Sequence, residues 1–259
     1  MILPYIDPII FQLGPVAIRW YGLTWLIAVF LIYLISKIRL KNLKNWNDEK
    51  LQELIFYGLL GAVIGGRLGY MLFYNFNELL LDPFSIFYIW QGGLSFHGGL
   101  LGVLTFIYIF SRSKWGSSFF ESTDFIAPAI PLGLGSVRIG NFLNSELLGR
   151  PTDLPWGVIF PSDPYGVIRH PSQLYQAFSE GFLLLVLLLW FTKKPRPPKS
   201  ISGIFLIGYG SVRFMSEFFR EPDIHIGFDF LELITRGQIL CIPMILIGVM
   251  ILFISYKRV

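Results

Sequence analysis

Long apolar runs alternate with short polar segments along almost the whole chain. About 20 apolar residues are enough to cross the hydrocarbon of a bilayer, and on that measure the pattern predicts seven membrane-spanning helices. The predicted spans cover residues 17–36, 52–74, 88–110, 119–140, 171–191, 201–219 and 238–256. We therefore expect an all-α polytopic membrane protein, a seven-transmembrane-helix bundle that forms one membrane domain over residues 1–259.

The lysines mark one side of the predicted bundle. All nine of them, together with four arginines, lie in the segments that follow the first, third, fifth and seventh spans. Positive residues collect in cytoplasmic segments, so the pattern predicts an external N-terminus and a cytoplasmic C-terminus. Residues 141–170 then lie outside. Their Gly, Pro and Asp residues indicate turns, with a short strand pair around 156–160, and we expect this stretch to form a small external cap.

Composition agrees with a membrane setting. Of 259 residues, 54% are hydrophobic and 15% are charged, whereas a soluble domain carries about 25% charged residues. The single cysteine, Cys241, excludes an internal disulfide framework. The N-terminal segment lacks a basic region and is interrupted by prolines, so we expect no cleaved signal peptide and a first span that is retained.

The eight remaining cationic residues are all arginines within spans or on the predicted external side, where topology gives no reason for positive charge. Guanidinium groups match phosphate oxygens bidentately. Arg67, Arg138 and Arg213 lie deepest, and an ionisable residue within a span marks a functional site by default. We interpret them as anion ligands. For four others, snorkelling to headgroups or pairing with a carboxylate is an equally good explanation; they are Arg19, Arg150, Arg169 and Arg236.

Four polar residues of the sixth predicted span share one helix face. Tyr209, Arg213, Glu217 and Arg220 stand at i, i+4, i+8 and i+11. One interpretation is a structural ladder, in which Glu217 pairs with both arginines and makes a polar seam between helices. The other is that Glu217 orients one or both arginines towards a phosphate.

Two glycine-rich segments lie in the second and third predicted spans. Gly61, Gly65 and Gly69 recur at a four-residue spacing that lets helices approach closely, so we interpret them as packing residues. Arg67 projects from a neighbouring part of that helix and could face a polar interior. His97, in QGGLSFHGGLLG, is the only histidine well within a predicted span. Buried arginines nearby would keep it neutral and able to accept a proton; the alternative is a core histidine with its hydrogen bonds satisfied.

Several kinds of chemistry lack their motifs. The three histidines and the lone cysteine stand in separate contexts without metal-ligand spacing, and the chain has no Walker loop, nucleophile elbow or HExxH. We expect no metal, no cofactor and no nucleic-acid partner. An enzyme of this composition would have to work by proton transfer, by placing cations and by orienting its substrates.

The segment GSVRIGNFLNSELLG, residues 135–149, resembles the signature of prolipoprotein diacylglyceryl transferases, which runs R-x-G-N-F-x-N-x-E-x-x-G. The resemblance continues in order through RWYGL, GGRLGY, GGLSFHGGLLG, HPSQLY and RFMSEFFREPD. It implies that a diacylglyceryl group passes from phosphatidylglycerol to the lipobox cysteine thiol of a prolipoprotein. The products would be a thioether and glycerol phosphate. The reaction would take place at the external side of a bacterial cytoplasmic (inner) membrane, as a step of lipoprotein biosynthesis.

The resemblance also implies residue roles. His97 matches the family's essential histidine, as base or positioning group for the thiol, and Arg138 and Arg213 match arginines that hold the phosphate. The other residues expected to bind substrate are Tyr21, Arg67, Asn141, Asn144, Glu146, Gly149, Tyr209, Glu217 and Arg220. A different function stays open, a transporter or flippase for an anionic lipid or solute, although such proteins often show related halves and we find no duplication here.

Overall fold

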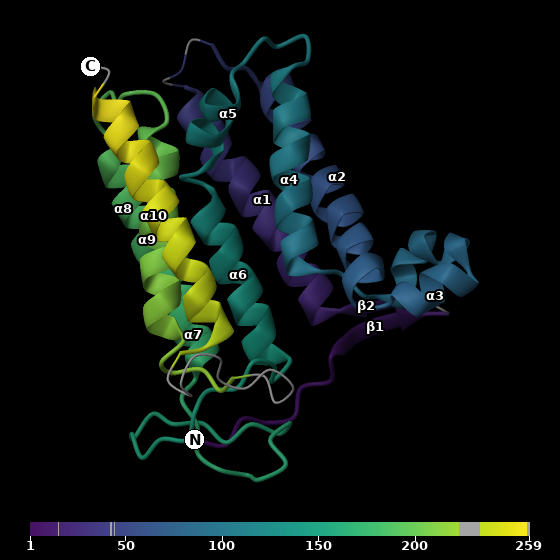
Figure 1. The fold of residues 1–259 in the computed structure, drawn as a ribbon. Helices are drawn as coiled ribbons and strands as arrows, with labels where there is room; N and C mark the ends of the chain where they lie inside the picture. Colours follow the sequence, from purple (N-terminus) through teal and green to yellow (C-terminus); the bar gives the residue numbers. More distant parts are fainter. Residues whose placement is uncertain (15, 42, 44, 223–233, 258–259) are drawn as a thin grey trace. The chain divides into compact units, whose positions relative to one another are not determined.

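The computed structural model describes residues 1–259 except 15, 42, 44, 223–233 and 258–259. Figure 1 shows a largely helical chain with one small sheet. In chain order the elements are β1 (Ile9–Leu13), β2 (Val16–Arg19), α1 (Trp20–Leu40), α2 (Asp48–Phe73), α3 (Phe76–Leu81), the 3₁₀ turns η1 (Pro83–Phe87) and η2 (Ile89–Gln91), α4 (Phe96–Ser111), α5 (Phe119–Ile126), α6 (Ile130–Leu143), α7 (Ser172–Gln176), the π-helix η3 (Ala177–Leu183), α8 (Leu184–Phe191), α9 (Ser200–Ser216) and α10 (Arg236–Lys257).

The helices confirm the prediction of a mostly helical membrane protein. Four are long and apolar enough to cross a bilayer, namely Trp20–Leu40, Asp48–Phe73, Ser172–Phe191 and Arg236–Lys257. The interrupted pair α5 and α6 makes a fifth candidate if it counts as one span. Among the described residues, length and composition thus support four or five spans, while the predicted number of seven and the orientation of the termini stay predictions.

Two predicted spans begin later than expected. Residues 17–19 belong to strand β2, which pairs antiparallel with β1 through Phe11 with Ile18 and Gln12 with Ala17. The helix starts only at Trp20 because this hairpin, which turns at Gly14 with φ 57°, takes the preceding residues. The span predicted from 88 starts at Phe96, after two 3₁₀ turns and two glycines with positive φ, and α4 has 16 residues.

The chain forms two compact units. The smaller one, residues 36–125, is built around α2 and α4, which lie side by side (Figure 1). Glycines make this approach possible: a Cβ on Gly61 would lie 2.5 Å from the Gly102 carbonyl oxygen, and one on Gly69 would lie 2.8 Å from the Gly98 Cα. The prediction that the glycines of the second span serve packing is confirmed.

The larger unit comprises residues 1–35 and 126–259. In it α6 packs on the π-helix η3, and α9 packs on α10 (Figure 1). The α6 contact passes through Gly135, where a Cβ would lie 3.1 Å from the Gly181 Cα. Helix α1 reaches α6 through Thr24, whose carbonyl oxygen accepts a 3.0 Å hydrogen bond from Ser136 Oγ. Close helix contacts of this kind stabilise a bundle that cannot rely on the hydrophobic effect within lipid.

The segment 144–171 has little regular structure and is held by buried polar contacts. Val158 and Arg169 exchange backbone hydrogen bonds of 2.9 Å, so part of the predicted strand pairing is present as an isolated bridge. The Arg169 guanidinium donates hydrogen bonds of 2.9 and 3.1 Å to the Asp163 carboxylate and holds the pKa of that carboxyl below its usual value. Of the two explanations for Arg169, pairing with a carboxylate is confirmed. The amino group of Met1 also donates to the Gly157 carbonyl oxygen at 2.8 Å.

Candidate active site

Arg138 and Arg213 meet at a buried carboxylate in the larger unit. Glu180 lies in the middle of the π-helix with none of its surface exposed. Arg138 Nε, from α6, donates to its Oε2 at 3.0 Å, and Arg213 Nη1, from α9, lies 3.6 Å from its Oε1. Three helical segments therefore place two guanidinium groups around one acid.

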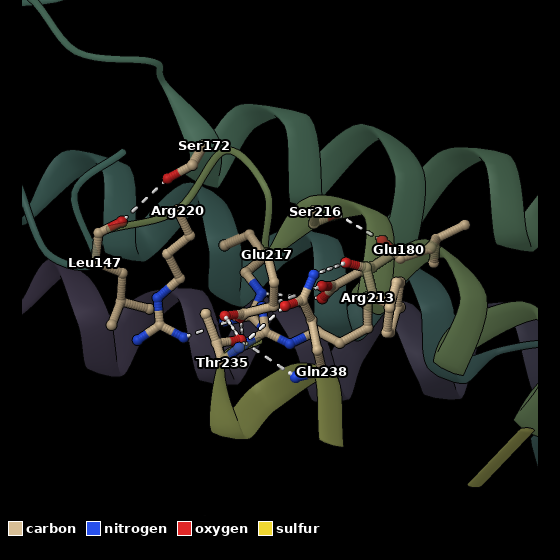
Figure 2. A network of polar contacts seen from close by, with 12 residues as sticks. Leu147, Ser172, Glu180, Arg213, Ser216, Glu217, Arg220, Thr235 and Gln238 are labelled. Carbon is tan, nitrogen blue, oxygen red and sulfur yellow. Dashed lines mark hydrogen bonds and ion pairs between the residues drawn. The ribbon is translucent and has the colours of Figure 1, made fainter. Parts of the chain in front are cut away.

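A second carboxylate continues the network (Figure 2). Glu217 is 3% exposed, pairs with Arg213 one turn earlier, and lies 3.4 Å from Arg220 Nη1. Its other oxygen accepts a 3.1 Å hydrogen bond from the Thr235 hydroxyl at the start of α10. The ladder of Arg213, Glu217 and Arg220 predicted from their spacing is confirmed, and Glu180 extends it to α6.

The network alternates in charge. Among the residues that the structure describes, Arg138, Arg213 and Arg220 pair here with Glu180 and Glu217 in an alternating order. Tyr209 on the same face of α9 lies within electrostatic range of Glu180, Arg138 and Arg213. Guanidinium groups fixed by carboxylates are well suited to hold phosphate oxygens in a set orientation.

Sequence reasoning missed Glu180. The signal was present, since it is the single acid in the apolar stretch of the fifth predicted span, and an ionisable residue within a span is a functional candidate by default. It went unrecognised because it belongs to none of the quoted motifs. The π-helix around it could not be read from the pattern, although such bulges occur often at functional sites.

The polar residues after α6 form a compact turn around Glu146. Asn141 Nδ2 donates to Glu146 Oε2 at 3.0 Å, and Asn144 Nδ2 donates to Oε1 at 3.2 Å. Ser145 and Leu147 have φ of 54° and 56°, a left-handed conformation that costs most residues energy and collects at functional sites. The structure thus brings together the three polar signature residues predicted to bind substrate and presents the Glu146 side chain at the surface.

The turn is anchored by neighbouring elements. Gln173 of α7 donates to the Glu146 carbonyl oxygen at 2.5 Å, and Ser172 donates to that of Leu147 at 3.1 Å (Figure 2). Gly149 pairs with Arg220 in an isolated bridge, and a Cβ on it would collide with the His170 carbonyl. Gly149 therefore lets the segment after the turn lie against the backbone of His170, just before α7.

An apolar groove lies in the same unit, lined in part by the helices that carry Arg138 and Glu180. It has a volume of about 360 Å³ and lies between α1, α6 and the π-helix. Leu23, Ile27, Ile139 and Phe182 contribute to its wall. Tyr21 lies half-buried in the first turn of α1, with its ring edge against Trp25 at a centroid distance of 6.4 Å. The shape and lining of this groove suit a hydrocarbon chain.

The two predicted site residues of the smaller unit have different surroundings. Arg67 is buried and donates to the chain's own carbonyl oxygens, those of Ser85 at 2.6 Å, Ile86 at 3.2 Å and Gly92 at 2.5 Å. These contacts fix the segment before α4, and a substrate contact of Arg67 stays a prediction. His97 was expected to be buried, which is wrong: it is exposed in the first turn of α4, whose N-cap is Ser95. Its place within a membrane span stays a prediction.

The sequence profile of the prolipoprotein diacylglyceryl transferase family matches residues 8–254. The chain belongs to this family. It is 48% identical over 258 residues to the phosphatidylglycerol–prolipoprotein diacylglyceryl transferase of Acinetobacter baylyi, 50% over 256 residues to that of Vibrio campbellii and 51% over 257 residues to that of Photobacterium profundum. Each match covers 98% of this chain and 94%, 93% and 95% of the respective relative. The resemblance stated from the motifs is confirmed, and the family membership makes the protein a transferase.

Proposed function

We propose that this protein transfers the diacylglyceryl group of phosphatidylglycerol to the lipobox cysteine thiol of a prolipoprotein. The observation that carries the proposal is the buried network in which Glu180 and Glu217 hold the guanidinium groups of three arginines, a set of donors that suits the phosphodiester of an anionic lipid. The apolar lining of the groove between α1, α6 and the π-helix suits hydrocarbon. Relatives that carry this enzyme's name match nearly the whole chain.

In the proposed reaction the thiol sulfur attacks the carbon of the diacylated glycerol that bears the phosphate ester. The new carbon–sulfur bond is a thioether, the carbon–oxygen bond breaks, and its electron pair stays on the phosphate of the departing glycerol phosphate. Arg138 and Arg213 stabilise the charge that develops on this leaving group. His97 takes the thiol proton or positions the thiol, which raises the thiolate fraction of a group with an ordinary pKa of about 8.5.

The remaining site residues support these groups. Glu180 and Glu217 orient the three guanidinium groups, while Tyr21, Tyr209 and Arg220 line the lipid site. The turn of Asn141, Asn144 and Glu146, backed by Gly149, offers hydrogen bonds to the headgroup or the peptide. In this proposal Arg67 contributes through the segment that it holds.

The proposal includes the topology. We infer one membrane domain of seven spans in a bacterial cytoplasmic membrane, with the N-terminus outside, the C-terminus inside and residues 141–170 as an external cap. Its support is the restriction of lysines to alternate segments. Impermeant labelling of cysteines introduced at Ser162 and Ser113 of intact cells tests it: only the Ser162 position should react. Reaction at Ser113 alone would reverse the orientation.

The activity is tested with a lipobox peptide and purified protein in phosphatidylglycerol vesicles, followed by mass spectrometry of the peptide. Wild type should add a diacylglyceryl mass to the cysteine, and vesicles of phosphatidylethanolamine alone should give none. Arg138→Ala should lower the rate about a hundredfold or more, as expected when a charge-stabilising group is lost. Arg112→Ala, which removes an exposed arginine beside Tyr108, is the matched control and should react like wild type.

Either of two results would contradict the assignment. Folded wild-type protein that adds no mass to the peptide would remove the transferase proposal. His97→Ala protein with an unchanged rate would keep the enzyme and exclude His97 as the group that activates the thiol.

A further inference from the structure

A row of buried polar side chains follows the helix that carries Glu180. Gln173 and Gln176 stand at i and i+3 in α7, and Glu180 follows four residues later in the π-helix. Each is at most 1% exposed. Buried amides in an otherwise apolar span are costly unless they find hydrogen-bond partners.

The two ends of this row are occupied by the protein itself. Gln173 Nε2 donates to the Glu146 carbonyl oxygen at 2.5 Å, which ties it to the signature turn. Glu180 holds Arg138 and Arg213 at the other end, as Figure 2 shows for Glu180 and Arg213. The middle of the row therefore lies between the turn and the guanidinium groups proposed to bind phosphate.

Gln176, in the middle, has no partner of its own. Neither Nε2 nor Oε1 makes a hydrogen bond to any described residue, and Gln173 Oε1 likewise accepts no hydrogen bond from one. Buried side-chain polar atoms are nearly always paired. An amide with both its donor and its acceptor unused, at 1% exposure, is a group held ready for a ligand that donates and accepts at once.

We propose that Gln176 binds the hydroxyl groups of the glycerol headgroup that leaves with the phosphate, and so sets the preference for a polyol lipid. The inference rests on the proposed function. A hydroxyl both donates and accepts, as the amide requires, whereas an ammonium headgroup would need a carboxylate, and Glu180 already faces two arginines. The polyol is esterified to the phosphate and therefore lies close to it, and Gln176 precedes Glu180, the partner of Arg138 and Arg213, by four residues.

Binding of two lipids to the full-length protein tests this without any turnover. The lipids are phosphatidylglycerol and phosphatidylpropanol, which differ only in the headgroup hydroxyls, and the variants are Gln176→Leu and Gln52→Leu, an exposed glutamine of α2 as matched control. Wild type and the control should prefer phosphatidylglycerol by about tenfold, as expected for a buried hydrogen-bonding site. Gln176→Leu should bind both lipids equally, with unchanged affinity for phosphatidylpropanol.

An unchanged preference in folded Gln176→Leu protein would overturn the inference, and so would wild type that binds both lipids alike. A rise in KM for the peptide with an intact lipid preference would assign Gln176 to the peptide and would equally overturn it. Because binding is measured without peptide, failure of the transferase proposal alone would leave this test valid. Removal of an unpaired amide should not destabilise the fold, and the thermal midpoint checks that.

Discussion

Replacing Glu180 by glutamine is the most informative change to the arginine network. The substitution keeps the size and shape of the side chain and removes its charge. Arg138 Nε loses its ionised partner at 3.0 Å, and Arg213 Nη1 loses one at 3.6 Å. Glu217 would then be the remaining carboxylate of the network among the described residues.

The size of the effect follows from these distances. At an effective dielectric constant of about 20, a unit charge pair at this separation attracts by about 5 kcal/mol. Loss of one partner of a buried ion pair is measured at about 3–5 kcal/mol, because the other charge stays buried. For a chain of this length a loss of 3 kcal/mol lowers the thermal midpoint by about 10 °C. The guanidinium groups also lose their orientation, and misplacement by about 1 Å lowers a rate about a hundredfold.

The assay measures the thermal midpoint and kcat/KM for phosphatidylglycerol on the same folded preparation. Glu78→Gln, which removes an exposed carboxylate on α3, is the matched control and should change neither quantity. Glu180→Asp keeps the charge and should fall between wild type and Glu180→Gln. If Glu180→Gln keeps its midpoint within 2 °C and its kcat/KM within about twofold, the carboxylate does not organise the arginines and the reasoning is refuted.

Three further predictions concern the scaffold. Gly69→Ala should force α2 and α4 apart, because its Cβ would lie 2.8 Å from the Gly98 Cα, and thermal unfolding should show a destabilisation of about 1–3 kcal/mol. Gly58→Ala, with open space at its Cβ, is the control. Equal effects of the two substitutions would contradict the packing argument. Arg169 lowers the pKa of Asp163, so the ionised carboxyl stabilises the fold above a pH of about 4. The difference in thermal midpoint between wild type and Asp163→Asn should therefore stay constant near neutrality and disappear as the pH falls below that value. A difference that has already disappeared at pH 6 would argue against this pair. Arg67→Met should speed hydrogen exchange in the segment 85–93, where Arg67 donates to the carbonyl oxygens of Ser85, Ile86 and Gly92. Unchanged exchange would refute its role in fixing this segment.

The helical fold was predictable because its signals are local. Apolar runs of sufficient length predicted most helices, and the glycine spacing predicted a close helix contact of α2, although not that α4 is its partner. The hairpin of β1 and β2 was not predictable, since a short apolar run such as VAIR fits a strand or the start of a span equally well. The break before α4 depends on the backbone at Gly92 and Gly93, whose positive φ the hydrophobic pattern does not reveal.

The site was predictable where a motif or a helix face carried it. The spacing of Arg213, Glu217 and Arg220 predicted that they share one helix face, and the signature predicted Asn141, Asn144 and Glu146 as site residues, although not the turn that brings them together. Glu180 joins these residues only through tertiary packing, from a helix distant in sequence, so its partners could not be deduced from spacing. The exposed position of His97 likewise depends on where α4 begins, which the pattern placed too early.

The central claim is that the arginine network serves a transfer reaction and not the passage of a lipid across the membrane. The measurement that tests it most directly is the amount of glycerol phosphate released, set against the amount of diacylglyceryl thioether formed on a lipobox peptide in the same reaction. The account predicts equal amounts, both dependent on peptide and phosphatidylglycerol and both formed about a hundredfold or more slowly by Arg138→Ala. Movement of phosphatidylglycerol between leaflets without either product would contradict the account and favour a flippase.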